Sequence, residues 1–220
     1  FFNGETIIKL SDYLNGGTKP YVHNQRVVWA GLEEKIYIYS ALDNTTISFK
    51  PTQFLFDGQP TTFDGKVVWQ GYDGQDREIF YYNGVEVIQL TNNNFNDIFP
   101  IIKDDVIAWM GFDGNDYEIF IYDGVEIKQI TNNNFPDGIP DISDGNVVWQ
   151  GDNNFPEIFL YDGQQISQLT SNRMAFAPRI YRDKIVWSEF DGRDSEIILY
   201  TIQPSDNSPP QTIITSAFDS

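Results

Sequence analysis

The sequence predicts an all-β chain folded as a β-propeller of five four-stranded blades. Tryptophans recur at intervals of 40, 40, 40 and 38 residues, at Trp29, Trp69, Trp109, Trp149 and Trp187. A proline precedes each tryptophan by nine residues, at Pro20, Pro60, Pro100, Pro140 and Pro178. Short β-branched and aromatic runs follow the same register, and no sustained helical periodicity competes with them. Four short strands per repeat of about forty residues are typical of a propeller blade.

The second repeat illustrates the strands expected in each blade. Residues 67–71, 78–82 and 85–90 are β-rich runs bounded by Gly, Asn and Asp. Asn83-Gly84 lies between the last two runs and predicts a tight two-residue hairpin turn, because both residues tolerate positive φ. A fourth, innermost strand is expected to begin at the proline, where a missing N–H removes no ladder hydrogen bond.

The register also predicts how the ring closes. Residues 5–11 align with residues 85–91, so the chain begins on the outer strand of a blade. We expect residues 5–11 to pair beside residues 196–200, because closure removes both exposed sheet edges. A single domain then spans residues 1–201, and residues 202–220 form a proline-containing tail. In the alternative, residues 211–214 form an extra edge strand, and the propeller is six-bladed or a truncated six-bladed ring.

The repeat contains a recurring motif. It reads Leu-Thr, then Asp-x-x-Pro, then Ser-Asp-Gly, then the tryptophan strand and Asp-Gly-x-Asp-x-Glu-Ile-Phe, as at 90–91, 97–100, 141–145 and 113–120. This pattern resembles the repeats of TolB-like β-propellers. The resemblance implies protein interaction or ligand binding and supplies no catalytic residues. TolB-like propellers usually have six blades, whereas this chain has five tryptophans. Together with the acidity and the polar loops, the resemblance suggests an extracellular or periplasmic location.

Charge restricts the partners that the chain is expected to bind. Fourteen Lys and Arg against 32 Asp and Glu give a net charge of −18. A field of this sign repels phosphate backbones and anionic lipids, so we expect neither nucleic-acid binding nor membrane insertion. A protein or glycan partner, and a monomer or one domain of a larger protein, remain the expectation. The chain has no cysteine, so disulfides and thiolate metal sites are excluded.

Acidic residues collect in the loops that follow the second strand of a blade. These loops and the connections between blades open on the same side of each sheet, which we call the loop face. No cofactor is required by the sequence, but oxygen-rich loops of this kind suit Ca²⁺. The candidate ligands are Asp73, Asp76, Glu78, Asp113, Asp116, Glu118, Asp191, Asp194 and Glu196. The competing interpretation is that Asp-Gly is turn chemistry, with the aspartates capping loop amides.

Aromatic and amide side chains accompany these acids on the loop face. Rings beside Asn and Asp are a common way to hold a sugar, by stacking and hydrogen bonds. The same rings also suit packing along the rim of the blades. The expected ligand face consists of Tyr72, Phe95, Phe112, Phe135, Asn93, Asn133, Asp97 and Asp137, and Phe155 and Phe190 lie in related loops.

Three functions remain open at this stage. A non-enzymatic binding scaffold, with its ligand or protein partner on the loop face, is the leading interpretation. A carbohydrate-binding, lectin-like module and a glycoside hydrolase or lyase are the alternatives. Catalysis requires residues that break the repeat, whereas the acids here recur with it, and the only histidine is His23. We therefore assign no catalytic residue and do not expect an enzyme.

Overall fold

The computed structural model describes residues 7–11, 17–32, 35–50 and 60–203. The chain divides into two compact units, residues 1–94 and residues 95–220, and each is described by itself. All named elements are β-strands, arranged in antiparallel sheets, four of them four-stranded and one three-stranded. Within the described residues no helix is long and apolar enough to cross a membrane. The all-β prediction is therefore confirmed.

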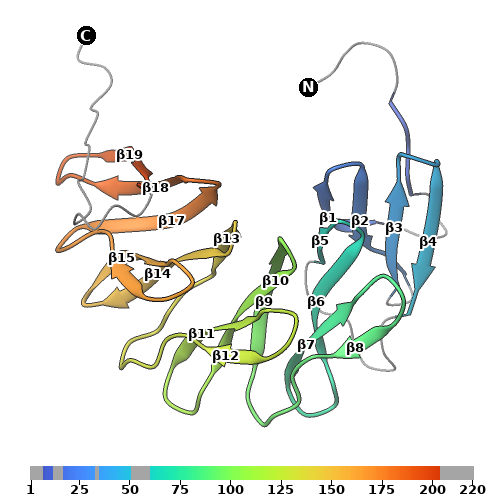
Figure 1. The fold of residues 1–220 in the computed structure, drawn as a ribbon, viewed down its shortest axis with the longest axis horizontal. Helices are drawn as coiled ribbons and strands as arrows, with labels where there is room; N and C mark the ends of the chain where they lie inside the picture. The colour runs from blue at the N-terminus through green and yellow to red at the C-terminus, as the bar shows by residue number, and fades with distance from the viewer. Residues whose placement is uncertain (1–6, 12–16, 33–34, 51–59, 204–220) are drawn as a thin grey trace. The chain divides into compact units, whose positions relative to one another are not determined.

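The first unit contains two sheets with strands in sequential order (Figure 1). One consists of β1 (Thr18–His23), β2 (Arg26–Ala30), β3 (Ile36–Ser40) and β4 (Thr45–Phe49). The other consists of β5 (Thr61–Phe63), β6 (Lys66–Tyr72), β7 (Arg77–Tyr82) and β8 (Val87–Gln89). Each tryptophan lies on the second strand of its sheet, as the repeat predicted.

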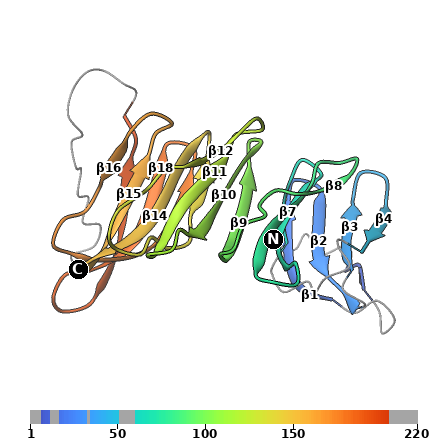
Figure 2. The same ribbon diagram turned by 90° about the horizontal axis from the view of Figure 1, so that it is seen from below.

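The second unit contains three sheets that pack face against face (Figure 2). The first consists of β9 (Asp97–Lys103), β10 (Val106–Phe112), β11 (Tyr117–Tyr122) and β12 (Ile127–Gln129). The second consists of β13 (Asp141–Ser143), β14 (Asn146–Asn153), β15 (Phe155–Tyr161) and β16 (Ile166–Gln168). The third consists of β17 (Met174–Tyr181), β18 (Lys184–Phe190) and β19 (Ser195–Thr201).

The last sheet differs from the prediction of five four-stranded blades, because its described strands number three. The expected fourth strand was residues 5–11, of which residues 7–11 are described and form no strand. Ile7 and Ile8 are 87% and 59% exposed. Residues 5–6 and the alternative strand 211–214 lie outside the described residues. Closure by residues 5–11 therefore stays a prediction.

Proline does not mark the start of the inner strand in three of the five sheets, so that expectation was wrong there. Strands β1, β9 and β17 begin before their proline, and their pairing shifts register around it. The residue before each of these prolines has positive φ, at Lys19 (52°), Phe99 (53°) and Ala177 (51°). Such a bulge accommodates a residue without an N–H inside a ladder, which the sequence pattern did not reveal.

The outer hairpins also differ from the predicted two-residue turns. Tyr82 pairs with Val87, so residues 83–86 form a four-residue turn. The Asn83 side chain accepts the N–H groups of Val85 and Glu86, both at 2.9 Å, and Gly84 has a φ of 100°. A two-residue turn of the predicted type needs positive φ at two positions, whereas this side-chain cap leaves a single position that requires glycine.

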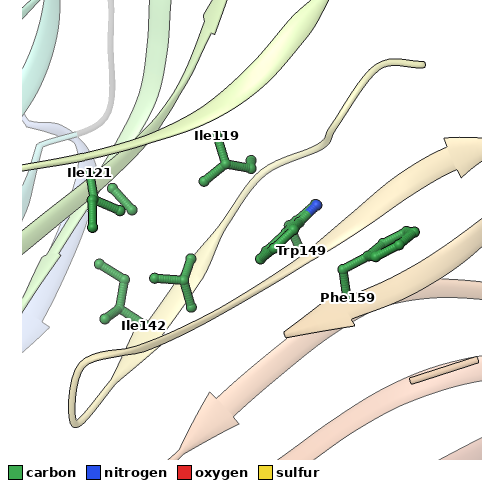
Figure 3. Close-up of a cluster of buried hydrophobic side chains, with 7 residues drawn as sticks. Ile119, Ile121, Ile142, Trp149 and Phe159 are labelled. Atoms are coloured by element: carbon green, nitrogen blue, oxygen red, sulfur yellow. The ribbon is translucent and has the colours of Figure 1, made fainter. Parts of the chain in front are cut away.

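The core of the second unit lies between its sheets, and the central sheet is buried on both faces. Trp149 and Ile142 contact Ile119 and Ile121 of the neighbouring β11 (Figure 3). Alternate residues such as Val148 pack on the other side against the β17–β19 sheet. This two-sided burial explains the continuous apolar runs of the second and third strands in each repeat.

Candidate functional site

On the loop face, the first aspartate of each Asp-Gly-x-Asp sequence caps a turn with its side chain. Asp113 Oδ1 accepts the N–H groups of Asn115 and Asp116 at 2.9 and 3.3 Å. The Asp191 turn repeats this arrangement, and its backbone donors lower the pKa of Asp191. Asn83 makes the same contacts in the outer hairpin, so the turn requires neither a charge nor a metal. The loop-face turns differ from the Asn83 turn by an aspartate at their fourth position, which is Asp76, Asp116 or Asp194.

A buried carboxyl pair ties the loop face of the second unit to its core. Glu118 and Asp137 are 0% and 1% exposed. Asn133 donates its backbone N–H to Glu118 Oε1 at 2.8 Å and its side-chain amide to Asp137 Oδ2 at 2.9 Å. The indole N–H of Trp149 donates to Asp137 Oδ1 at 2.8 Å. These bonds fix residues 131–137 against two neighbouring sheets.

The carboxyl pair has a distinctive protonation state. Burial raises the pKa of Glu118 to about 7, the hydrogen bonds from Thr131 and Asn133 oppose the shift, and the charge of Asp137 adds to it. Burial also raises the pKa of Asp137. Two carboxylates this close cannot both ionise at low cost. Below about pH 7 the folded state therefore favours a proton on the Glu118 carboxyl.

The motif glutamate has the same structural role in the neighbouring sheets. Glu78 accepts the N–H of Asn93 at 2.7 Å, and Glu157 accepts the N–H of Arg173 at 3.2 Å and the hydroxyl of Thr170. The isoleucine that follows each glutamate donates its backbone N–H to a threonine hydroxyl at 2.8–2.9 Å. The pairs are Ile79–Thr91, Ile119–Thr131 and Ile158–Thr170. Each glutamate thus holds the connection that follows its sheet in place by accepting a backbone hydrogen bond from it.

A glycine opposite the aspartate allows its carboxylate to reach the tryptophan. Asp97 pairs with Gly111 across β9 and β10, and Trp109 donates its indole N–H to Asp97 Oδ1 at 2.7 Å. A Cβ atom at Gly111 would lie 2.6 Å from that same oxygen. The glycine two residues after the tryptophan is therefore required by close approach rather than by turn geometry.

In the β17–β19 sheet the carboxylate stands on the tryptophan strand, β18, and the small residue stands on the inner strand, β17. Ala175 stands where the β9–β12 and β13–β16 sheets have Asp97 and Asp137, and Glu189 stands opposite it where they have glycine. Glu189 Oε2 accepts the indole N–H of Trp187 at 3.1 Å, and its other carboxylate oxygen, Oε1, pairs with Arg173 at 2.5 Å. A buried carboxylate thus reaches the tryptophan from the opposite strand.

The β1–β4 sheet has glycine at both positions. Thr18 pairs with Ala30, which places Gly17 opposite Gly31. The indole nitrogen of Trp29 is buried and, within the described residues, has no hydrogen-bond partner. The ring stacks on Tyr37 with centroids 5.3 Å apart. This sheet therefore leaves a buried donor unsatisfied, which is costly.

The expected calcium ligands fall into three different arrangements. Asp73, Asp76 and Glu78 each place a carboxylate oxygen within 4.8 Å of the others. Asp191, Asp194 and Glu196 also come together, but all three are exposed. Among the described residues Asp113, Asp116 and Glu118 form no such group. In that loop Glu118 Oε1 accepts the backbone N–H of Asn133.

The expected ligand face divides into exposed and packed residues. In the first unit Tyr72 is 37% exposed and Asn93 is exposed. In the second unit Phe95 is 41% exposed and rests edge-on against Phe112 at 5.7 Å. Phe135 stacks on the core ring Phe159 at 6.0 Å. Asp97, Asp137 and Asn133 are occupied by the contacts above, so we leave these three and Phe135 out of the proposed binding surface.

A groove of about 470 Å³ opens on the loop face of the second unit. Its walls come from the β14–β15 turn, the connection into β17 and the β18–β19 turn. The lining residues are Phe155, Ser171, Asn172, Arg173, Met174, Phe190, Asp191 and Gly192. Phe155 and Phe190 are 47% and 40% exposed. The sequence drew attention to these two rings. Residues 171–174 were missed, because they depart from the Asn-Asn-Asn-Phe of the other connections.

Grooves also lie on the side opposite the loop face. Within the first unit a groove of about 350 Å³ is lined by Arg26, Asp43, Lys66 and Tyr82 among others. Within the second unit a shallower one of about 370 Å³ lies beside Asp144 and Arg182. Grooves are therefore present on both sides of the sheets within the described residues.

Comparisons with known proteins identify the fold. No protein-family model and no curated protein matches the chain. A putative TolB from Agrobacterium tumefaciens is similar in structure, with a TM-score of 0.59 and 14% identity over 83% of this chain and 76% of that one. A chain of a nidogen/laminin complex has a TM-score of 0.54 and 10% identity over 83% and 74%. A puromycin hydrolase has a TM-score of 0.61 and 10% identity over 84% and 36%.

These similarities establish a β-propeller fold and nothing finer, because all three identities are low. The chain spans about a third of the puromycin hydrolase chain, at 36%. One fold of this kind serves unrelated functions. Function must therefore be argued from the residues on the surface of this chain.

Proposed function

We propose that this chain is a non-enzymatic binding module whose ligand docks in the groove between Phe155 and Phe190. The single observation that carries the proposal is this groove, in which two exposed rings stand beside amide, cationic and anionic side chains. Concave surfaces that combine apolar walls with a few polar groups are the usual form of ligand sites. Loops held by rigid sheets are the usual location of recognition.

The composition of the groove favours a carbohydrate ligand. Sugar rings present one apolar face, which stacks on Phe155 or Phe190, and hydroxyls, which bond to amide and carboxylate groups such as Asn172 and Asp191. Arg173 lies at the same surface while its guanidinium holds Glu189 at 2.5 Å, which restrains its geometry. A partly pre-organised site of this kind loses less side-chain entropy when a ligand binds.

A basic protein is the second candidate partner, and the observation that favours it is the net charge of −18. Opposite charges accelerate encounter, so association with a basic protein should slow as salt rises. This partner would use the wider loop face, whereas a glycan needs only the groove. Glycan cleavage, the third function open from the sequence, is distinguished by whether a bound glycan is hydrolysed.

The test is a glycan array probed with the whole chain, followed by a hydrolysis assay on every glycan that binds. Phe155→Ala and Phe190→Ala should weaken binding by about tenfold or more, since aromatic anchors dominate such sites. Tyr181→Ala is the matched control, because this ring is 62% exposed on the opposite side of the same unit. Binding that survives both phenylalanine changes, or that Tyr181→Ala weakens equally, would overturn the proposal. Cleavage of the bound glycan would replace it with an enzymatic function.

A further inference from the structure

The β6–β7 loop of the first unit contains a carboxylate in an unusual environment. Each carboxylate oxygen of Asp76 is buried, with less than 1 Å² exposed, and within the described residues neither accepts a hydrogen bond. Burial without a donor strongly disfavours a negative charge. A fully buried carboxylate normally finds a hydrogen-bond donor, a counter-ion or a proton.

The neighbours of Asp76 increase this cost. Carboxylate oxygens from Asp73 and Glu78 lie within 4.8 Å of an Asp76 oxygen and of one another. Three converging carboxylates repel one another when nothing positive stands between them. The hydrogen bonds of this loop leave ligand atoms available, because those to Asp73 engage Oδ1 alone. Such an arrangement provides what a cation needs, three anionic oxygens on a short loop.

The other turns of the chain show that the arrangement is not required for folding. The outer hairpin turn at residues 83–86 has the same backbone and the same side-chain cap, but its fourth residue, Glu86, is exposed. The turn can therefore form without a buried acid at its end. Asp76, at the equivalent position of its own turn, instead has both carboxylate oxygens buried, and one of them lies within 4.8 Å of a Glu78 carboxylate oxygen.

We propose that Asp73, Asp76 and Glu78 bind a calcium ion. Ca²⁺ accepts six to eight oxygen ligands in flexible geometry, whereas Mg²⁺ demands a near-ideal octahedron. Three carboxylates on one side, with water completing the shell above the half-buried Asp73, suit the larger ion. The site belongs to the first unit and does not depend on the groove at Phe155 and Phe190.

Two other acidic groups serve as internal controls. Asp191, Asp194 and Glu196 converge in the same way but are exposed, so water already solvates them. Asp116 has a buried oxygen, Oδ1, that accepts no hydrogen bond within the described residues, but the carboxylates of Asp113, Asp116 and Glu118 do not converge as a group there. Within the described residues, the Asp73 group thus combines convergence with burial.

The experiment titrates the whole chain with CaCl₂ and, separately, with Tb³⁺ as a luminescent calcium analogue. Calcium should raise the melting temperature with the logarithm of its concentration above the dissociation constant. Tb³⁺ emission should be sensitised by Tyr72, whose hydroxyl donates to the carbonyl of Gly74 in this loop at 3.1 Å. Tyr72→Phe should therefore change the excitation spectrum without abolishing the calcium shift.

The decisive variants are Asp73→Asn and Asp76→Asn, with Asp194→Asn and Asp116→Asn as controls. Asp73→Asn keeps the turn, because Asn83 caps the equivalent turn with the same contacts. Both decisive variants should weaken calcium binding by about tenfold or more, since affinity follows ligand charge. The controls should bind as the unmodified chain does. Absence of any calcium shift and Tb³⁺ emission, or undiminished binding by Asp73→Asn, would overturn the site.

Discussion

At the scale of single residues, the contribution of a buried tryptophan to folding stability depends on whether its indole N–H has a hydrogen-bond partner. Trp109 and Trp149 donate to aspartates at 2.7 and 2.8 Å, whereas the buried indole N–H of Trp29 has no partner within the described residues. A buried donor without a partner costs about 1 to 3 kcal/mol. Restoring the missing carboxylate should therefore recover part of that energy.

We predict that Gly17→Asp raises the free energy of unfolding by about 1 kcal/mol. A Cβ atom at position 17 would lie 3.3 Å from Trp29 Cδ1, which brings a carboxylate within reach of the indole nitrogen. The nearest obstacle is Ser11 Oγ at 2.9 Å, the end of a side chain that can rotate away. Chemical denaturation measures the change. In the Trp29→Phe background the gain should disappear, and a gain that persists there would contradict the explanation.

Glu118 makes a second prediction at this scale, about pH. Its folded pKa is about 7, above the ordinary value of 4.5. The folded state therefore holds this proton more tightly than the unfolded chain does. The stabilisation is full below pH 4.5 and is lost as the pH rises through about 7.

Glu118→Gln removes this titration and keeps an acceptor for the Asn133 N–H. Relative to the unmodified chain, the variant should be more stable at about pH 8 than at about pH 4.5, by on the order of 1 to 3 kcal/mol. Unfolding curves of both proteins at several pH values provide the measurement. Glu126→Gln, at an exposed position of the outer hairpin, is the matched control and should show no such trend. A Glu118→Gln difference that is constant with pH would exclude the protonated pair.

At the scale of the sheet, the partner of the tryptophan can come from either of two paired strands. Asp97 opposite Gly111 and Glu189 opposite Ala175 are two solutions to one requirement, a carboxylate beside a buried indole. We predict that Glu189→Gly destabilises the chain by about 2 to 4 kcal/mol, because it removes a buried, charged partner. Adding Ala175→Asp should recover most of that loss. Denaturation of the single and double variants forms a double-mutant cycle, and purely additive effects would show that the two positions do not substitute for each other.

The same scale shows how far the sequence alone leads. The spacing of Trp and Pro and the Gly, Asn and Asp boundaries were sufficient to predict the five sheets and the strand that contains each tryptophan. They did not reveal the bulge at Pro100, because positive φ at Phe99 depends on the partner strand. Nor did they reveal that Glu118 points inward, because strand alternation does not say which acids find donors in a neighbouring connection. Groove residues 171–174 were missed because Asn172 and Arg173 break the repeat.

At the scale of the whole molecule, the unfilled position is the outer edge of the β17–β19 sheet. Every other sheet has four strands, and in this one β19 is the last described. Ile197 and Leu199 on β19 are 76% and 46% exposed. An edge of this length, with apolar side chains and no further strand paired to it within the described residues, is a template for another strand. Residues 5–11 match the outer-strand pattern of the repeat and supply Ile7 and Ile8.

We predict that deleting residues 1–11 lowers the unfolding midpoint, broadens the transition and increases hydrogen exchange in β19. Each effect follows from leaving the β19 backbone without a partner, which also invites association between molecules. Deleting residues 204–220 removes the alternative strand 211–214 and serves as the matched comparison. If the second deletion exposes β19 and the first leaves its exchange unchanged, the outer strand comes from the C-terminal segment.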